Sequence, residues 1–221
     1  MAKAHGGKIL ADHLHRQGVA RVFSVPGESF LAALDGLYDH AIDNVVCRQE
    51  GGAAMMAEAH AKLTGRPGVL FVTRGPGATN ASSGLHVAMH DATPLVCFVG
   101  QVPLAHRDRG VFQEVNYRAL FGPLVKWVAE VERTDRIGEY VDRAFAVAQS
   151  GRPGPVVLAL PEDVLSAVID APDAAPLPAT PTSAVAPETV AQAVEILKTA
   201  QRPLIICGGS QWDADTGQAA A

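Results

Sequence analysis

The chain has 221 residues, of which 48% are hydrophobic, and this is enough for a domain with a sizeable core and part of a second one. Its 18 basic and 23 acidic residues give a net charge of −5 without a basic cluster, which argues against nucleic acid as a partner. The cysteines Cys47, Cys97 and Cys207 lie in apolar runs and lack the spacing of a disulfide framework or a zinc site. The sequence shows no signal peptide and no apolar run near the ~18 residues of a membrane span, so we expect a soluble, cytoplasmic protein without a membrane partner.

Strand-like and helix-like segments alternate along the first hundred residues. Apolar residues at helical spacing predict helices over 7–17, 30–38, 51–64 and 77–90, and apolar runs predict strands over 21–25, 44–47, 68–73 and 94–99. This alternation predicts an α/β fold of three layers, with helices on both faces of a mainly parallel sheet of about six strands.

The periodicity is lost between residues 101 and 122, where the polar run 105–110 indicates a mobile loop of the kind that is often functional. A short strand is predicted at 126–128, an amphipathic helix at 137–148 and a last buried strand at 156–160.

The composition then changes to Ala, Pro, Asp and Thr. We expect a first domain over residues 1–165, a Pro/Ala-rich linker over 166–186, and at 187–221 the start of a further α/β unit with a helix and a strand at 203–207. About 35 residues cannot bury a core of their own, so we expect the sequence to be an amino-terminal portion of a longer polypeptide.

Glu50 stands where the apolar strand 44–47 gives way to a helix rich in Gly, Ala and Met. Open α/β sheets bind their ligands at the carboxyl ends of the strands. Apolar surroundings there favour the protonated form of a carboxyl group, which would let Glu50 exchange a proton near neutral pH. The alternative is a structural role, in which the carboxylate only interacts with the helix dipole.

Two glycine-containing turns follow predicted strands in the same way. The run Arg74-Gly75-Pro76-Gly77-Ala78-Thr79-Asn80 follows strand 68–73, and its glycines would let a ligand approach the backbone at the start of a helix. Pro26-Gly27 follows strand 21–25. The alternative for both is a tight strand-to-helix turn without a ligand.

The histidines give no sign of a metal site. His86, His90 and His106 lack ligand spacing with a nearby cysteine or carboxylate, and His60 is more typical of a packed side chain. We therefore expect no protein metal site in this chain.

A succession of short motifs runs from residue 5 to residue 165. They are Phe23-Ser24-Val25-Pro26-Gly27, Arg48-Gln49-Glu50-Gly51-Gly52-Ala53, Gly75-Pro76-Gly77-Ala78-Thr79-Asn80, Asp91-Ala92-Thr93-Pro94, Gly100-Gln101-Val102-Pro103, Phe112-Gln113-Glu114, Gly151-Arg152-Pro153-Gly154-Pro155 and Leu160-Pro161-Glu162-Asp163. In this order they closely resemble the amino-terminal, pyrimidine-binding domain of the thiamine diphosphate enzymes of the acetolactate synthase type. Residues 187–221 resemble the start of that family's middle domain.

The resemblance implies a role for Glu50 as the catalytic glutamate that bonds N1′ of the cofactor's aminopyrimidine and promotes its imino tautomer. The 4′-imino nitrogen would then remove the thiazolium C2 proton, and the carbanion would attack a 2-oxo acid that loses carbon dioxide. The residues implied to bind thiamine diphosphate are Pro26, Gly27, Glu50, Thr73, Gly75, Gly77 and Asn80, and those implied on the substrate side are Phe112, Gln113 and Lys126.

Further cofactors and partners follow from the same resemblance. Mg²⁺ would be held by a Gly-Asp-Gly element of a carboxyl-terminal domain, which this sequence lacks, while FAD is left undetermined. The active site would lie between subunits of a homodimer or homotetramer that acts on a small 2-oxo acid such as pyruvate. The chain by itself should then be inactive.

Two residues depart from the family's pattern. Glu28 stands in place of a second glycine, and Arg74 stands in place of a serine. An extra carboxylate would repel an acidic substrate whereas an arginine would bind one, so the substrate is left open. The alternatives are a related 2-oxo acid or acyl-CoA decarboxylase or lyase, and a non-enzymatic α/β domain that binds a nucleotide or a partner chain.

Overall fold

The computed structural model describes residues 3–172, 175–177, 184–209, 212 and 214–220. The predicted linker falls in part on residues 173–174 and 178–183, which lie outside the described residues. The domain boundaries stay a prediction.

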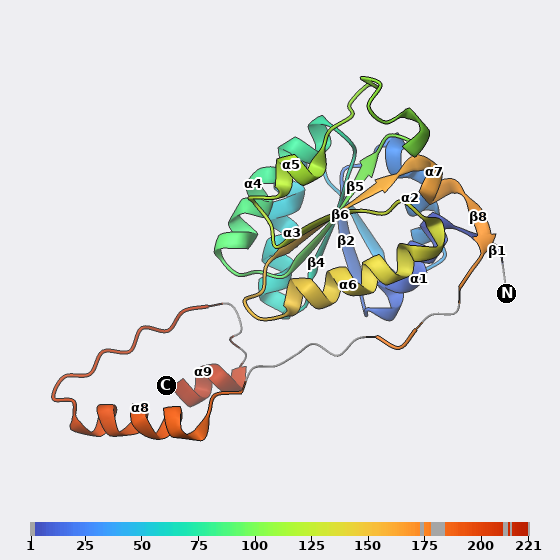
Figure 1. Cartoon of the computed structure of the whole chain (residues 1–221). Coiled ribbons are helices and arrows are strands. Elements are labelled where there is room, and N and C mark those ends of the chain that lie inside the picture. Colours follow the sequence, from blue (N-terminus) through green and yellow to red (C-terminus); the bar gives the residue numbers. More distant parts are fainter. Residues whose placement is uncertain (1–2, 173–174, 178–183, 210–211, 213, 221) are drawn as a thin grey trace.

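Among the described residues, six parallel strands form the central sheet (Figure 1). In spatial order they are β3 (Asp43–Val46), β2 (Arg21–Ser24), β4 (Gly68–Val72), β5 (Leu95–Gln101), β7 (Pro155–Pro161) and β6 (Trp127–Glu130). Every neighbouring pair in this sheet is parallel. The predicted α/β fold is therefore confirmed.

The order of the strands reverses between β2 and β4. From β2 the chain goes outward to β3 and then returns to β4 on the other side of β2. Such a switch point leaves a crevice at the carboxyl ends of the two strands, where open α/β sheets bind ligands. The loops after β2 and β4 therefore border the favoured position for a site.

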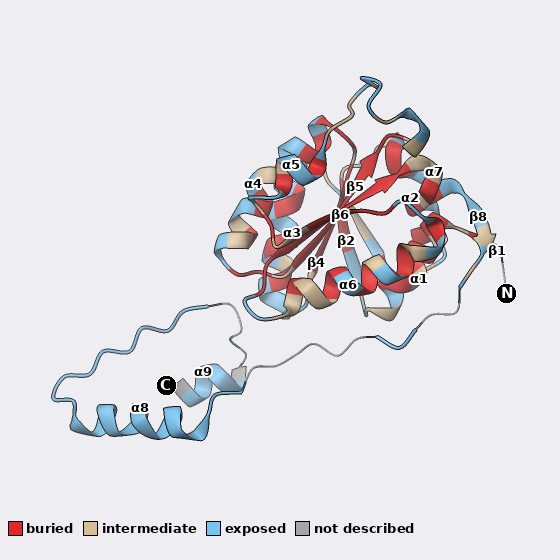
Figure 2. Cartoon of the chain, viewed as in Figure 1, coloured by how far each residue is buried: buried red, intermediate tan, exposed pale blue. Residues whose placement is uncertain are grey.

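Helices cover both faces of the sheet (Figure 1). One face packs against α1 (Gly6–Arg16), α2 (Leu31–Tyr38), α6 (Ile137–Gln149) and α7 (Glu162–Ser166), and the other packs against α3 (Glu50–Thr64), α4 (Pro76–His90) and α5 (Tyr117–Phe121). Phe71 of β4 belongs to the first core cluster and Leu70 to the second, because successive side chains of a strand point to opposite faces. The central strands β4, β5 and β7 are accordingly buried along their whole length, whereas the edge strand β3 has no buried residue (Figure 2).

Small residues bring α3 close to its neighbours. A Cβ atom added at Gly84 of α4 would lie 2.4 Å from Cβ of Ala54, and one at Gly68 would lie 2.2 Å from the carbonyl oxygen of Ala57. Larger side chains would push α3 away from α4 and from β4. The Gly- and Ala-rich sequence of α3 and α4 thus fixes the start of α3, and with it Glu50, against the turn that precedes α4.

Several short elements differ from the expectation. The strand β1 (Lys3–His5) pairs in an antiparallel way with β8 (Val168–Asp170). The strand β8 lies inside the range 166–186 that was predicted as linker. The helix α5 and the single turn η2 (Leu104–His106) lie in the stretch 101–122 that was predicted to lack periodicity. The helix α7 and the turns η1 (Glu28–Phe30) and η3 (Thr134–Arg136) were not predicted, and η1 takes in Phe30, where a helix was expected to begin. Elements of three to five residues are too short to show a periodic pattern in the sequence.

The carboxyl-terminal part contains α8 (Pro187–Thr199), which was expected, and α9 (Ala214–Ala220). The apolar side chains Val190, Ile196 and Leu197 of α8 are exposed (Figure 2). The strand expected at 203–207 is not formed, because a strand needs a neighbour for its hydrogen bonds and described residues 184–209 contain none. None of the helices in the described ranges is long and apolar enough to cross a membrane.

Candidate functional site

The turns after β2 and β4 touch at the switch point of the sheet. A Cβ atom at Gly27, after β2, would lie 2.5 Å from Cβ of Thr73, after β4, so that only glycine fits there. The Thr73 hydroxyl lies 2.8 Å from the hydroxyl of Ser29 and shares a hydrogen bond with it. The two loops are therefore held in one arrangement by close contact and by a polar bond.

Two further glycines lie where the chain enters α4, Gly75 just before the helix and Gly77 in its first turn. Gly75 has φ of +62°, a left-handed conformation that favours glycine, and its N–H donates to the hydroxyl of Tyr117 at 3.0 Å. A Cβ atom at Gly77 would lie 2.8 Å from Cγ2 of Thr73 and 3.4 Å from Oε1 of Glu50. The bare backbone of Gly77 thus lies between Thr73 and the Glu50 carboxylate.

Glu50 is the first residue of α3 and is half-buried. The side chain of the preceding Gln49 caps the helix by accepting a hydrogen bond from the N–H of Gly52 at 2.7 Å. Asn80 of α4 donates from Nδ2 to Oε2 of Glu50 at 3.0 Å, which orients the carboxylate toward Gly77. The carboxylate therefore stays accessible to a ligand, and its surroundings in this chain are less apolar than the sequence suggested.

The structure brings the residues predicted to bind the cofactor to the carboxyl edge of the sheet. They are Pro26, Gly27, Glu50, Thr73, Gly75, Gly77 and Asn80. Two loops, after β2 and β4, and the starts of the helices α3 and α4 supply them. This convergence is the geometric support for a common site, while the role of each residue stays a prediction.

The residues predicted on the substrate side are not all brought together. Gln113, which has φ of +64°, packs against the turn, since a Cβ atom at Gly75 would lie 2.7 Å from its Cβ atom. Phe112 beside it is 74% exposed. Lys126 lies before β6, at the opposite, amino edge of the sheet, where its ammonium group donates to the carbonyl oxygens of Val147 and Ser150. Burial lowers the pKa of Lys126.

The two residues that depart from the family's pattern bind each other. The Arg74 guanidinium donates to Oε1 of Glu28 at 2.8 Å and also bonds the carboxylate of Glu162, the first residue of α7. The Arg74 side chain is only 9% exposed, whereas that of Glu28 is 74% exposed. Arg74 therefore joins the segments after β2 and β4 to the start of α7, and two carboxylates already occupy its guanidinium group.

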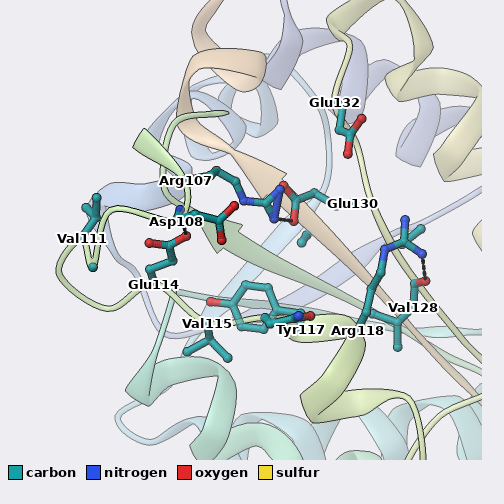
Figure 3. A pocket seen from close by; sticks show the side chains of 14 residues that line it. Arg107, Asp108, Val111, Glu114, Val115, Tyr117, Arg118, Val128, Glu130 and Glu132 are labelled. Carbon is teal, nitrogen blue, oxygen red and sulfur yellow. Dashed lines mark hydrogen bonds and ion pairs between the residues drawn. The ribbon is translucent and has the colours of Figure 1, made fainter. Parts of the chain in front are cut away.

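A second feature of this edge is a cavity of about 700 Å³ between residues 107–118 and the ends of β6 and β7 (Figure 3). Glu130, which ends β6 and is 6% exposed, forms an ion pair with Arg107 there. Burial raises the pKa of the Glu130 carboxyl group, and the positive charge of Arg107 opposes this in part.

Sequence reasoning missed Glu130 and Tyr117. Glu130 is the last residue of the strand β6, whereas the strand was predicted to end at residue 128, so Glu130 was not considered at the carboxyl end of the sheet. The Tyr117 hydroxyl accepts from Gly75 N–H and donates to the Gly100 carbonyl, contacts that link distant segments and leave no pattern in the sequence.

Comparison with known proteins adds an independent line of evidence. Residues 4–120 match the family described as thiamine pyrophosphate enzyme, N-terminal TPP binding domain. Acetolactate synthase of Bacillus subtilis (strain 168) is 35% identical over 94% of this chain and 36% of its own length. Acetolactate synthase isozyme 2 large subunit of Escherichia coli (strain K12) is 37% identical over 93% of this chain and 37% of its own length.

The mitochondrial acetolactate synthase catalytic subunit of Aspergillus candidus is 33% identical over 96% of this chain and 32% of its own length. The chain thus spans about a third of the length of the curated relatives it matches. The family match covers more than half of the chain and contains all the residues predicted to bind the cofactor. The chain therefore belongs to the thiamine pyrophosphate enzyme family and carries its N-terminal, TPP-binding domain.

Proposed function

We propose that this chain is the pyrimidine-binding part of a thiamine diphosphate-dependent enzyme that acts on 2-oxo acids, most like acetolactate synthase. The reaction would be decarboxylation of pyruvate and carboligation to a second carbonyl group. The observation that carries the proposal is the Glu50 carboxylate, which Asn80 holds beside the bare backbone of Gly77 at the switch point. The similarity to three acetolactate synthases supports it.

The residues present fit an aminopyrimidine ring. The glycines at 27 and 77 leave backbone surface without side chains, against which a flat ring can lie. The carboxylate at the edge of this surface can share a proton with a ring nitrogen. Thiamine diphosphate, when bound, supplies the electron sink that no protein side chain provides.

Glu50, Asn80 and Tyr117 would each have one role at the bound ring. Glu50 holds and returns a proton at the ring nitrogen, and Asn80 keeps its carboxylate oriented for that exchange. The Tyr117 hydroxyl accepts a hydrogen bond from the N–H of Gly75 and so fixes the turn before α4. The cofactor's pyrimidine ring would then lie against backbone that is held in one conformation.

The remaining parts of the enzyme belong to the same proposal. Mg²⁺ and the diphosphate would be bound by a further domain, and that domain would come from a second subunit of a homodimer or homotetramer. A cytoplasmic location is proposed with it. Because Lys126 lies at the amino edge of the sheet, we do not include it among the substrate-side residues of this subunit's site.

Turnover of pyruvate by the complete reading frame, with Mg²⁺ and thiamine diphosphate, tests the proposal. The parent should release carbon dioxide and form acetolactate, and Glu50→Gln should lose about 10²-fold or more of the rate. Glu139→Gln is a matched control, because Glu139 is an exposed acid of α6 that pairs with Arg136.

The products separate the possible reactions. Acetaldehyde in place of acetolactate would assign a decarboxylase and would remove the carboligase part of the proposal. Full activity of Glu50→Gln would remove the proposed role of Glu50.

A further inference from the structure

His86 and His90 of α4 form a pair of converging imidazoles on the surface of the protein. They are four residues apart on one face of the helix, and both are exposed. Their Nε2 atoms are 3.1 Å apart and their ring centroids are 4.4 Å apart, with an angle of 53° between the ring planes. Contrary to the expectation from the sequence, we propose that His86 and His90 bind a divalent transition-metal ion through their Nε2 atoms.

The separation of the two nitrogens fits this role. A metal–nitrogen bond of about 2.0–2.1 Å places two ligands about 2.9 Å apart at a right angle and about 3.3 Å apart at the tetrahedral angle. The observed 3.1 Å lies between these values. Without metal, a hydrogen bond joins the two Nε2 atoms. A metal ion would replace the proton of that bond, and both exposed rings can turn so that their lone pairs point at the ion.

The backbone that carries His90 is fixed by neighbouring side chains. Arg152 donates to the carbonyl oxygens of Met89 and His90 at 2.6 Å each, and it thereby caps the last turn of α4. The next residue, Asp91, is bonded to Lys62 at 2.6 Å, so its carboxylate is engaged and is not counted as a ligand. The backbone at this end of α4 is thus fixed, and the hydrogen bond between the two rings orders them before any metal binds, which lowers the entropic cost of binding.

The ligand set selects the class of metal. Imidazole nitrogens suit Ni²⁺, Cu²⁺ and Zn²⁺, whereas Mg²⁺ and Ca²⁺ prefer oxygen ligands. In the described part of the chain, no group of three His, Cys, Asp or Glu side chains could hold a metal ion, so water or another chain would complete the coordination. The pair also begins about 15 Å along α4 from its first residue, Pro76, so this site is separate from the Glu50 site and independent of the proposed function.

Isothermal titration of the whole chain, without an affinity tag, with Ni²⁺ tests the proposal. The parent should bind one Ni²⁺ at this site, and His86→Gln and His90→Gln should each weaken that binding about tenfold or more. His106→Gln and Cys207→Ser are matched controls, because they remove an exposed imidazole and an exposed thiol elsewhere and should bind as the parent does. Mg²⁺ should not compete.

Two outcomes would overturn the proposal. One is a parent that does not bind Ni²⁺ under these conditions. The other is unchanged binding in both His86→Gln and His90→Gln, which would place the metal elsewhere. Both side chains are exposed, so the variants should fold, and the far-UV circular dichroism of each variant checks this.

Discussion

Replacing Arg74 with glutamine removes the cation that joins the loops after β2 and β4 to the start of α7. The bond from Arg74 to Glu162 involves a side chain that is 9% exposed and one that is 32% exposed. A hydrogen bond between charged groups of this kind contributes about 1.5–3 kcal/mol. The bond to Glu28 contributes about 0–1 kcal/mol, because Glu28 is 74% exposed and water replaces the partner.

One effect opposes this loss. The Nε atom of Arg74 is buried without a hydrogen-bond partner among the described residues, and removing it recovers about 1 kcal/mol. The net cost of Arg74→Gln is therefore about 2 kcal/mol, which lowers the melting temperature of a domain of this size by about 4–8 °C.

Thermal unfolding followed by circular dichroism measures this effect. The matched control is Arg133→Gln, which removes an ion pair between two well-exposed side chains and should leave the melting temperature unchanged. Glu162→Gln should be more destabilising than Glu28→Gln, since Glu162 is the better buried partner. If Arg74→Gln has the same melting temperature as the parent, the ion pairs between the segments after β2 and β4 and the start of α7 contribute nothing to stability, and the reasoning is refuted.

Three other changes test parts of the site. Gly77→Ala should weaken cofactor binding by the complete enzyme, and Thr73→Ser should partly restore it in calorimetric titrations, because it removes the Cγ2 atom that lies 2.8 Å from the added Cβ atom. Tyr117→Phe should lower the free energy of unfolding by about 1–2 kcal/mol in urea denaturation, because it leaves the buried N–H of Gly75 without an acceptor. Burial raises the pKa of Glu130 above its ordinary 4.5, so the folded state keeps a proton that the unfolded state releases, and stability falls as the pH rises through that window. Urea denaturation should therefore show Glu130→Gln gaining stability relative to the parent as the pH rises from about 4.5 toward neutrality, and a constant difference would contradict this reasoning.

The sequence predicted the central sheet and its main helices because their apolar patterns are long and regular. Glu50 and the glycines at 75 and 77 were predicted as site residues because each follows an apolar run of strand character in the sequence. In a parallel sheet the carboxyl ends of the strands lie at one edge, so these residues lie at the same edge. The resemblance to a known family pointed to the same residues. The family match confirms the resemblance, while the roles of these residues stay predictions.

Contacts between distant segments were beyond the sequence pattern. Glu28 and Arg74 were read as two opposing influences on a substrate, whereas the pairing of β2 with β4 brings them into one ion pair. Lys126 was assigned to the substrate side from the family resemblance, although it begins the predicted strand 126–128 and the structure places it at the amino end of β6. The pairing of β1 with β8 joins segments more than 150 residues apart, and neither is long enough to show a pattern.

The central claim, that Glu50 controls a proton on the pyrimidine of bound thiamine diphosphate, is tested most directly by deuterium exchange at C2 of the cofactor. The measurement uses the complete reading frame with Mg²⁺ and needs no substrate, so it does not depend on which 2-oxo acid is used. The account predicts rapid exchange in the parent and in Glu139→Gln, and exchange slowed about 10²-fold or more in Glu50→Gln with the cofactor still bound. Equal exchange rates in the parent and in Glu50→Gln, at equal occupancy of the cofactor, would contradict it.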